Sequence, residues 1–245
     1  MLNGIQAVLY REVHVYRKKA KKQVLASSIS PLLFLIAFGW GFGDEVSVNG
    51  LPYIVFLIPG LLTMATLNQS YGIAQELNIA RFYFHIFDEY LIAPVTYAGI
   101  VAGETLYGMF KSLVSIALIF GYVFLFGVDL RFHPLFVPAM ALHCFLFSAL
   151  AVTVSMMIRD HGSQAQINTF VITPMIFLCG TFFPVDKLPG IFNLIVHILP
   201  LTYSTKAIRA SLTGGVVDLS DMAILLACSV LFFCTATWAI KRVEA

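Results

Sequence analysis

Three ionisable side chains lie inside long apolar stretches of the sequence. They are Glu104, Lys111 and His143. An ionisable group within a membrane span is costly and commonly functional, so contact with a substrate or a gate is one interpretation of each. Glu104 and Lys111 are seven residues apart, about two helical turns, and a pair between them is the other interpretation. For His143 we expect a role in helix packing, with its hydrogen bonds satisfied.

The sequence contains no familiar motif for chemistry of its own. A GxxxxGK[ST] phosphate-binding loop, an HExxH metal motif and a GxSxG nucleophile motif are all absent. The four cysteines lie in apolar runs without the spacing of metal ligands. We therefore expect this chain to bind no metal and no cofactor.

Composition indicates a protein of the membrane. Apolar residues make up 59% of the 245 residues and charged residues only 11%, whereas soluble domains average about 25% charged residues. The mean hydropathy is +0.87, and the net charge of +2 is too small to indicate a nucleic-acid partner. We expect an all-α integral membrane protein, with residues 1–245 forming a single transmembrane domain.

Six apolar stretches are long enough to cross a bilayer, which takes about 20 residues of helix. They cover residues 24–43, 51–72, 97–127, 134–158, 163–183 and 222–240. Residues 1–23 mix apolar positions at helical spacing with Arg and Lys, which is typical of an amphipathic helix in contact with membrane lipid. The sequence thus predicts an interfacial helix followed by six transmembrane helices.

Two further stretches fit neither a span nor an ordinary loop. Residues 73–96 combine aromatic side chains with charges, which suits a short helix that either binds a partner protein or lies flat on the membrane. Residues 184–200 are too short for a span and contain several prolines, and irregular backbone at membrane depth needs protein or water to satisfy it. We expect a re-entrant element beside a gated path, with the gate residues Phe183, Pro184, Asp186, Lys187, Pro189 and Pro200.

The distribution of basic residues predicts the orientation. With six spans, both termini lie on one side of the membrane. Ten of the 15 Lys and Arg residues fall on that side and four on the other, with Lys111 inside a span. Because cytoplasmic loops carry the excess of Lys and Arg, we expect cytoplasmic termini. Residues 73–96 would then face the cytoplasm and residues 184–200 the outside.

Several runs resemble those of the membrane subunits of ABC-2 type exporters, in the branch of nodulation-type lipo-oligosaccharide and daunorubicin-type permeases. The matching runs are YIVFLIPGL (53–61), YLIAPV (90–95), VITPMIFLCGTFFPVDKLP (171–189) and LPLTY (199–203). The resemblance covers essentially the whole chain, because the order and spacing of the six spans agree as well. The family often has Lys or Arg near the start of the third span, where this chain has Glu104.

The resemblance implies a division of labour between subunits. Two copies of this permease would work with two copies of a separate ABC ATPase, which would bind ATP and Mg. The chain itself would be a transport subunit of a bacterial plasma (inner) membrane and not an enzyme. It would move an amphipathic substrate, such as a glycolipid, a lipid-linked saccharide or a drug, out of the cytoplasm or the inner leaflet.

The resemblance also assigns roles to three segments. Residues 1–23 match the interfacial helix, and residues 184–200 match a pair of short outward re-entrant helices. Residues 73–96 match the cytoplasmic loop whose short coupling helix docks on the ATPase, here near residues 84–91. The coupling residues would be Phe84, Phe87, Asp88, Glu89, Tyr90 and Leu91.

Two other classes of function compete with this one. The first is a membrane-embedded enzyme that uses Glu104, His143 or His161 on a lipid-linked substrate and turns over without an ATPase. The second is a secondary transporter, a class that often shows internal repeats. The two halves of this sequence share no convincing similarity, which makes the secondary transporter the weakest of the three.

Overall fold

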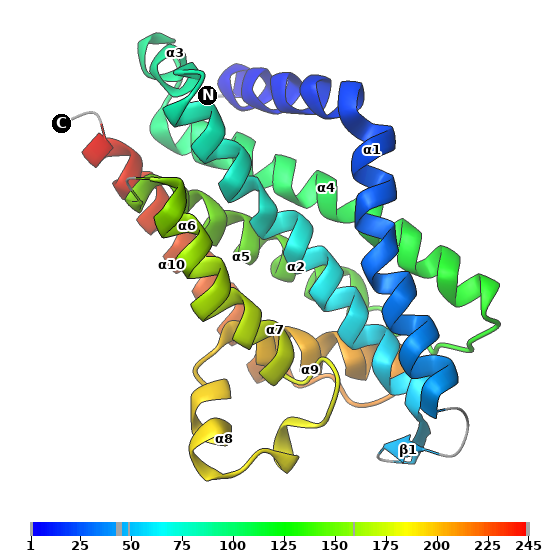
Figure 1. Cartoon of the computed structure of the whole chain (residues 1–245). Helices are drawn as coiled ribbons and strands as arrows, with labels where there is room; N and C mark the ends of the chain where they lie inside the picture. The colour runs from blue at the N-terminus through cyan, green and yellow to red at the C-terminus, as the bar shows by residue number, and fades with distance from the viewer. Residues whose placement is uncertain (1, 43–45, 49, 159, 244–245) are drawn as a thin grey trace.

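The computed structural model describes residues 2–42, 46–48, 50–158 and 160–243. Within these ranges the chain is almost entirely helical (Figure 1). The strands β1 (Ser47–Val48) and β2 (Leu51–Pro52) form a short antiparallel pair. The helices are α1 (Leu2–Phe42), α2 (Tyr53–Phe82), α3 (Ile86–Ile92), α4 (Tyr97–Leu125), α5 (Phe136–Met157), α6 (His161–Ile167), α7 (Thr173–Leu178), α8 (Gly190–Val196), α9 (Pro200–Thr213) and α10 (Leu219–Val243).

Five helices of the described chain are long and apolar enough to cross a membrane: α1, α2, α4, α5 and α10. Helices α8 and α9 meet at an angle of 82°, and they would make a sixth span only if this bent pair counted as one. The predicted span at 163–183 consists of α6, a π-helical turn (Asn168–Ile172) and α7 in succession. It ends at Leu178, before the predicted boundary, and Gly180 beyond it has a left-handed φ of 85°.

Helix α1 joins two elements that the sequence analysis separated. It is unbroken from Leu2 to Phe42 and has Pro31 inside it, so residue 23 is not a helix end. Figure 1 shows its first part lying across one end of the bundle and the remainder turning along the bundle. The last residue of the predicted first span, Gly43, lies outside the described ranges. The predicted interfacial segment and first span are therefore one continuous helix that bends between them.

Helix α2 forms the centre of the bundle. It packs against α1, α4, α5 and α9, and side chains such as Leu57, Leu61 and Leu67 are completely buried. A helix that is apolar all round is expected at such a central position. Close approach depends on Gly60, since a Cβ atom there would overlap the carbonyl oxygen of Thr181 and lie 2.9 Å from its Cα. The segment after α7 is thus pressed directly against α2.

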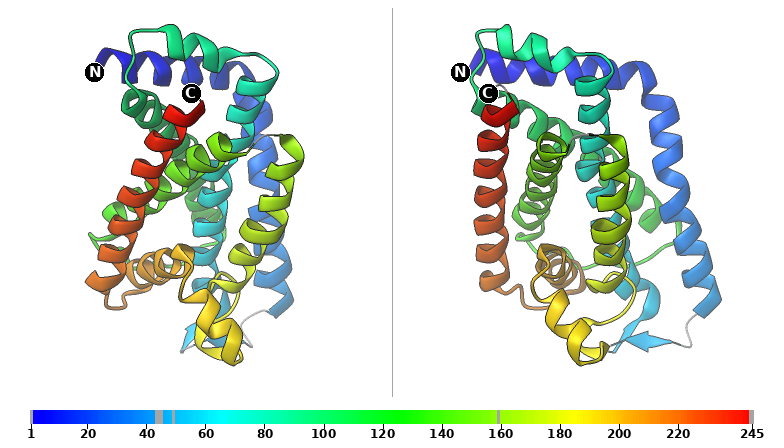
Figure 2. Two further views of the ribbon diagram at one scale, coloured as in Figure 1. Left: turned by 90° about the vertical axis from the view of Figure 1, so that its left-hand side faces the viewer. Right: turned by 60° about the vertical axis from the view of Figure 1, so that its left-hand side comes forward.

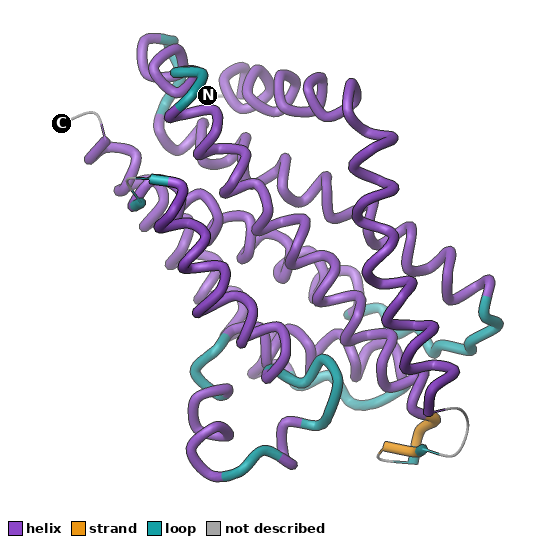
Figure 3. Tube along the Cα trace, in the orientation of Figure 1, coloured by secondary structure: helices purple, strands orange, loops and turns teal. Residues whose placement is uncertain are grey.

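The two ends of the bundle differ in what they hold. The start of α1, helix α3 and the end of α10 gather at one end, and the β1–β2 pair, α8 and α9 lie at the other (Figures 1 and 2). Most of the longer loops also lie at the end with α8 and α9, as Figure 3 shows. We call these the α3 end and the α8 end.

Candidate functional sites at the two ends of the bundle

Near the α3 end, Lys111 is paired with a carboxylate from another helix. Its Nζ donates to Oε1 of Glu76 at 2.9 Å, and the hydroxyl of Tyr107 donates to the other carboxylate oxygen at 2.9 Å. The predicted pair of Lys111 with Glu104 is therefore wrong. Seven residues of helix separate those two positions by about 10.5 Å along the axis. The neighbouring helix α2 supplies the partner instead.

Glu104 occupies a more isolated position on α4. Only 1% of its surface is exposed. Its Oε1 atom is buried and has no hydrogen-bond partner among the described residues. Burying a carboxyl group costs free energy unless hydrogen bonds replace those it made with water. Glu104 is thus the polar group of this bundle whose position most needs an explanation.

A second polar cluster connects α3 to the first part of α1. Nη1 of Arg11 donates to the hydroxyl of Tyr90 at 3.0 Å and also contacts the carboxylate of Glu12. The Tyr90 hydroxyl donates to the same carboxylate at 3.3 Å. Burial, together with the nearby charges of Glu104 and Glu12, raises the pKa of Tyr90, so its phenol stays protonated as a donor. Helix α3 is therefore tied to α1 by these hydrogen bonds and by the Arg11 guanidinium, which lies 5.6 Å from the centre of the Tyr90 ring.

A short helix, α3, lies where the coupling helix was predicted, but it begins later than expected. His85 has a left-handed φ of 51°, which an α-helix does not accommodate, so α3 begins at Ile86 and Phe84 precedes it. Phe87 is 1% exposed and packs edge-on against Tyr90, whereas Phe84 is 66% exposed. Glu89 is exposed. The remaining two predicted coupling residues, Asp88 and Leu91, have side chains outside the described part of the structure.

His143 lies inside the bundle, where α5 meets α2. Its Nε2 is 3.0 Å from Oγ1 of Thr66, and its ring lies 4.9 Å from that of Phe147. Its Nδ1 has no hydrogen-bond partner among the described residues. We expected both ring nitrogens to be hydrogen-bonded, and only Nε2 is. The structure places His143 in helix packing. The side chain of His161, which the enzyme hypothesis also invoked, is not described.

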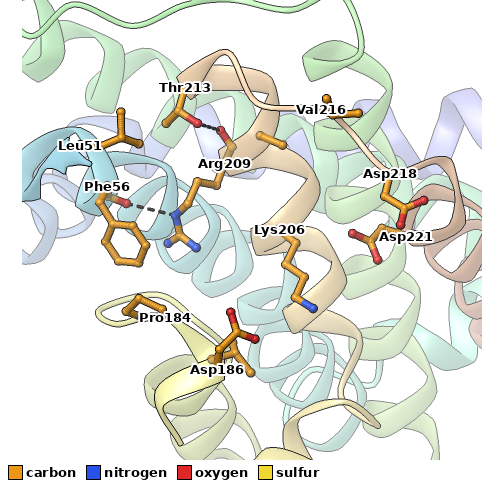
Figure 4. A pocket seen from close by; sticks show the side chains of 12 residues that line it. Leu51, Phe56, Pro184, Asp186, Lys206, Arg209, Thr213, Val216, Asp218 and Asp221 are labelled. Carbon is orange, nitrogen blue, oxygen red and sulfur yellow. Dashed lines mark hydrogen bonds between the residues drawn. The ribbon is translucent and has the colours of Figure 1, made fainter. Parts of the chain in front are cut away.

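At the α8 end a cavity of about 390 Å³ opens beside the predicted gate (Figure 4). Two cationic side chains of α9 line it, and three carboxylates lie around them. The cations are Lys206 and Arg209, and the acids are Asp186, Asp218 and Asp221. Hydrogen bonding to the backbone N–H of Ser220 lowers the pKa of Asp218, which keeps this carboxylate charged. A mixed set of charges of this kind suits a polar head group.

Arg209 holds the cavity wall together. Its guanidinium lies 3.9 Å from the centre of the Phe56 ring, and its Nε donates to the Phe56 carbonyl at 3.3 Å. Its Nη2 donates to the carbonyl of Gly180. Next to it, the hydroxyl of Tyr53 donates to the Phe182 carbonyl at 3.0 Å. Side chains of α2 and α9 thus fix the backbone that leads into the gate segment.

The predicted gate residues occupy distinct places in this wall. Pro184 and Asp186 line the cavity. Lys187 is exposed in a 3₁₀ turn (Val185–Lys187), and Phe183 is half-buried. Pro189 and Pro200 stand immediately before α8 and at the first position of α9, where a missing N–H costs nothing. The prolines therefore start short helices.

Sequence reasoning missed several charged residues that build these sites, among them Glu12, Glu76 and Arg209. Glu76 lay beyond the predicted end of the second span, but α2 continues to Phe82 and keeps Glu76 inside the bundle. The signal that could have found it is the helical periodicity that continues past residue 72. No group of three or more His, Cys, Asp or Glu side chains in the described chain is placed to hold a metal ion.

Comparison with known proteins supplies the family. Residues 3–213 match the ABC-2 type transporter family. The chain is 29% identical to Nodulation protein J of Sinorhizobium fredii, with 93% of this chain and 89% of that protein covered. It is 31% identical to Nodulation protein J of Rhizobium meliloti, with 85% and 81% covered.

A further relative carries a different name. The inner membrane transport permease YadH of Escherichia coli is 26% identical, with 86% of this chain and 83% of that protein covered. Members of this family typically work with an ABC ATPase. The family match spans most of the chain and includes α1 through α9, so both polar sites lie almost wholly within it. This chain therefore belongs to the ABC-2 type transporter family, as a membrane transport subunit.

Proposed function

We propose that this chain is the transmembrane subunit of an ATP-driven exporter in a bacterial inner membrane. Two copies would work with two copies of a separate ABC ATPase and move an amphipathic substrate out of the cytoplasm or the inner leaflet. The family match and the names of the relatives, among them an inner membrane transport permease, support this proposal. ATP and Mg would be bound by the partner subunit.

One observation carries the mechanism we propose: Tyr90 of α3 is hydrogen-bonded to Arg11 and Glu12 of α1. Helix α3 presents Glu89 outward, and its buried Phe87 anchors it on the bundle. A force applied to α3 by a docked ATPase would therefore reach α1 directly, and α2 through the short connection at residues 83–85. We assign α3 as the coupling helix and place the α3 end in the cytoplasm.

The cavity at the opposite end fits the release step of such a cycle. It lies between the gate segment and α9, and its lining is charged at one wall and apolar at another, with Leu51, Phe56 and Val216 among the apolar residues. An amphipathic molecule presents both kinds of surface. We therefore assign the α8 end to the outer face of the membrane.

The proposal is tested by expressing the chain with the ATPase that accompanies it and purifying the complex through a tag on this chain alone. We expect the ATPase to copurify and to hydrolyse ATP. The double reversal Asp88→Lys/Glu89→Lys should fold normally. Because it inverts the charge of the docking helix, the ATPase should either fail to copurify or copurify with most of its hydrolysis lost. The reversal Asp129→Lys, in an exposed loop toward the α8 end, is the matched control.

Two results would overturn the proposal. One is purification of the chain alone in several detergents, with no ATPase bound. The other is turnover of a lipid-linked substrate by the chain alone, which would establish the enzyme hypothesis.

A further inference from the structure

A second cavity, of about 320 Å³, lies inside the α3 end of the bundle. Its walls come from the first part of α1, the second half of α2, the start of α4 and the residues around the beginning of α3. Three carboxylates line it: Glu12, Glu76 and Glu104. The volume is at the lower limit of small-molecule sites, enough for a head group and the first part of a chain.

The charges in this cavity are not fully matched. Glu76 receives hydrogen bonds from Lys111 and Tyr107. Glu12 is held by Arg11 and Tyr90. Glu104 is the carboxylate whose buried Oε1 meets no donor among the residues the structure describes.

The two cations that line the cavity do not supply the missing donor. Arg11 is engaged by Glu12 and the hydroxyl of Tyr90. Lys19 is exposed, so its ammonium group keeps its water. With both cations accounted for, a molecule that enters the cavity is a candidate partner for Oε1 of Glu104.

Much of the remaining lining is apolar and includes Val15, Ile86 and, from α2, Ile73, Leu77 and Ala80. Polar atoms come from Tyr16, Gln23 and Tyr107. A hydrocarbon chain is stabilised by such a surface in proportion to the apolar area it covers, about 25 cal/mol per Å². A small hydrated ion would leave this surface uncovered. The cavity thus combines one unmatched carboxylate with room for an apolar chain.

We propose that this cavity binds the ammonium head of an amine-bearing amphiphile, with Glu104 as the carboxylate that receives its N–H groups. An ammonium group carries three donors and no acceptor, which complements a carboxylate in a dry site. A neutral head would leave Glu104 unmatched, and an anionic head would add a second buried negative charge. Binding requires only this chain, so a test of this site is independent of the proposal that the chain works with an ATPase.

The test uses the full chain in nanodiscs of phosphatidylcholine, with tritium-labelled dodecylamine as the probe at neutral pH. We expect saturable binding that unlabelled dodecylamine displaces, while dodecanol, of equal chain length and without charge, competes about tenfold less well, a difference of about 1.4 kcal/mol. Glu104→Gln should weaken dodecylamine binding by a similar factor. Asp129→Asn, at an exposed carboxylate outside the cavity, should bind as the wild type does.

A second variant, which keeps all three carboxylates, tests the cavity independently in case Glu104→Gln misfolds. Ala80→Leu fills the apolar wall and should reduce binding of dodecylamine and dodecanol alike, because it removes space and leaves the charges unchanged. Equal competition by dodecanol and dodecylamine would overturn the proposal. So would wild-type affinity in a folded Glu104→Gln variant.

The ammonium head could belong to a membrane lipid or to a free amine, and nanodisc composition separates the two sources. If phosphatidylethanolamine occupies the site, replacing part of the phosphatidylcholine with it should lower the apparent affinity for dodecylamine in the wild type. An unchanged affinity would assign the site to free amphiphilic amines. In both cases, weaker dodecylamine binding by Glu104→Gln is the result that supports the proposal.

Discussion

Lys111 of α4 reaches across to Glu76 of α2, at 2.9 Å, and not to Glu104 two turns away on its own helix. Glu76 and Glu104 line the same cavity, but Glu76 joins two helices, whereas Oε1 of Glu104 has no hydrogen-bond partner among the described residues. Glu76 therefore has a structural role, and Glu104 is the carboxylate that we propose binds a ligand. The two roles lead to different expectations for substitutions at these positions.

Removing the cation of the Lys111–Glu76 pair should destabilise the protein. Lys111→Met leaves Glu76 without its cation, and we expect the free energy of unfolding to fall by about 1–3 kcal/mol. The fall should lie near the lower end of this range, because Glu76 is one-third exposed. The melting temperature in detergent measures this. Adding Glu76→Gln should restore part of the loss, and Lys18→Met, at an exposed lysine, should leave the melting temperature unchanged. Equal losses in the single and double variants would contradict the pairing.

Close packing between α4 and α5 should make Gly108 intolerant of a side chain. A Cβ atom there would overlap Oγ of Ser148 and lie 2.9 Å from its Cβ. Gly108→Ala should therefore lower the free energy of unfolding by about 1–3 kcal/mol. Gly121→Ala is the control, since it lies on the same helix and meets no atom within 4 Å. If both variants have the same melting temperature, the two helices are not in contact at Gly108.

Arg209 should be needed to hold residues 180–188, the segment between α7 and α8. Arg209→Lys keeps the charge but loses the planar fork that serves the carbonyls of Phe56 and Gly180 together. We expect faster hydrogen exchange in residues 180–188, with the rest of the bundle protected as before. Lys206→Gln, one turn earlier in the same cavity, should leave this exchange unaltered. Unchanged protection in Arg209→Lys would mean that packing alone fixes the segment.

The link between α3 and α1 should depend on a single hydroxyl group. Tyr90→Phe keeps the ring against Phe87 and removes the hydrogen bonds with Arg11 and Glu12. We expect a stability loss of about 1 kcal/mol, and a larger effect on ATP hydrolysis by the complex with the ATPase. Tyr10→Phe, at a tyrosine that is 74% exposed on α1, provides the comparison. Normal hydrolysis in Tyr90→Phe would remove the basis for transmission through this contact.

Local pattern was enough to predict the helical class, the short helix before the third span and the proline-broken segment. Each of these depends on neighbours in sequence: a run of apolar residues, or prolines such as Pro189 and Pro200 that begin short helices. The length of α1 was not accessible in this way, because the basic residues around Lys18 resemble the end of an element although the helix continues through them.

The polar contacts could not be predicted for a different reason. The partner of Lys111 depends on how α4 packs against α2, and the contacts of Arg209 depend on a loop that passes Gly60. Both are relations between distant parts of the chain, which periodicity within one segment does not encode. That Glu104 lacks a hydrogen-bond partner can likewise be recognised only once the partners of the neighbouring side chains are known.

The contact between Gly60 and Thr181 has a consequence for the speed of any opening at the α8 end. With Tyr53 and Arg209 bonded to the carbonyls of Phe182 and Gly180, residues 180–182 cannot swing as a free loop on the nanosecond scale. They move only when α2 and α9 move, and displacements of packed helices take microseconds to milliseconds. If the α8 end is the exit, as proposed, it would stay shut against thermal leakage of small solutes and would open at the pace of a turnover cycle.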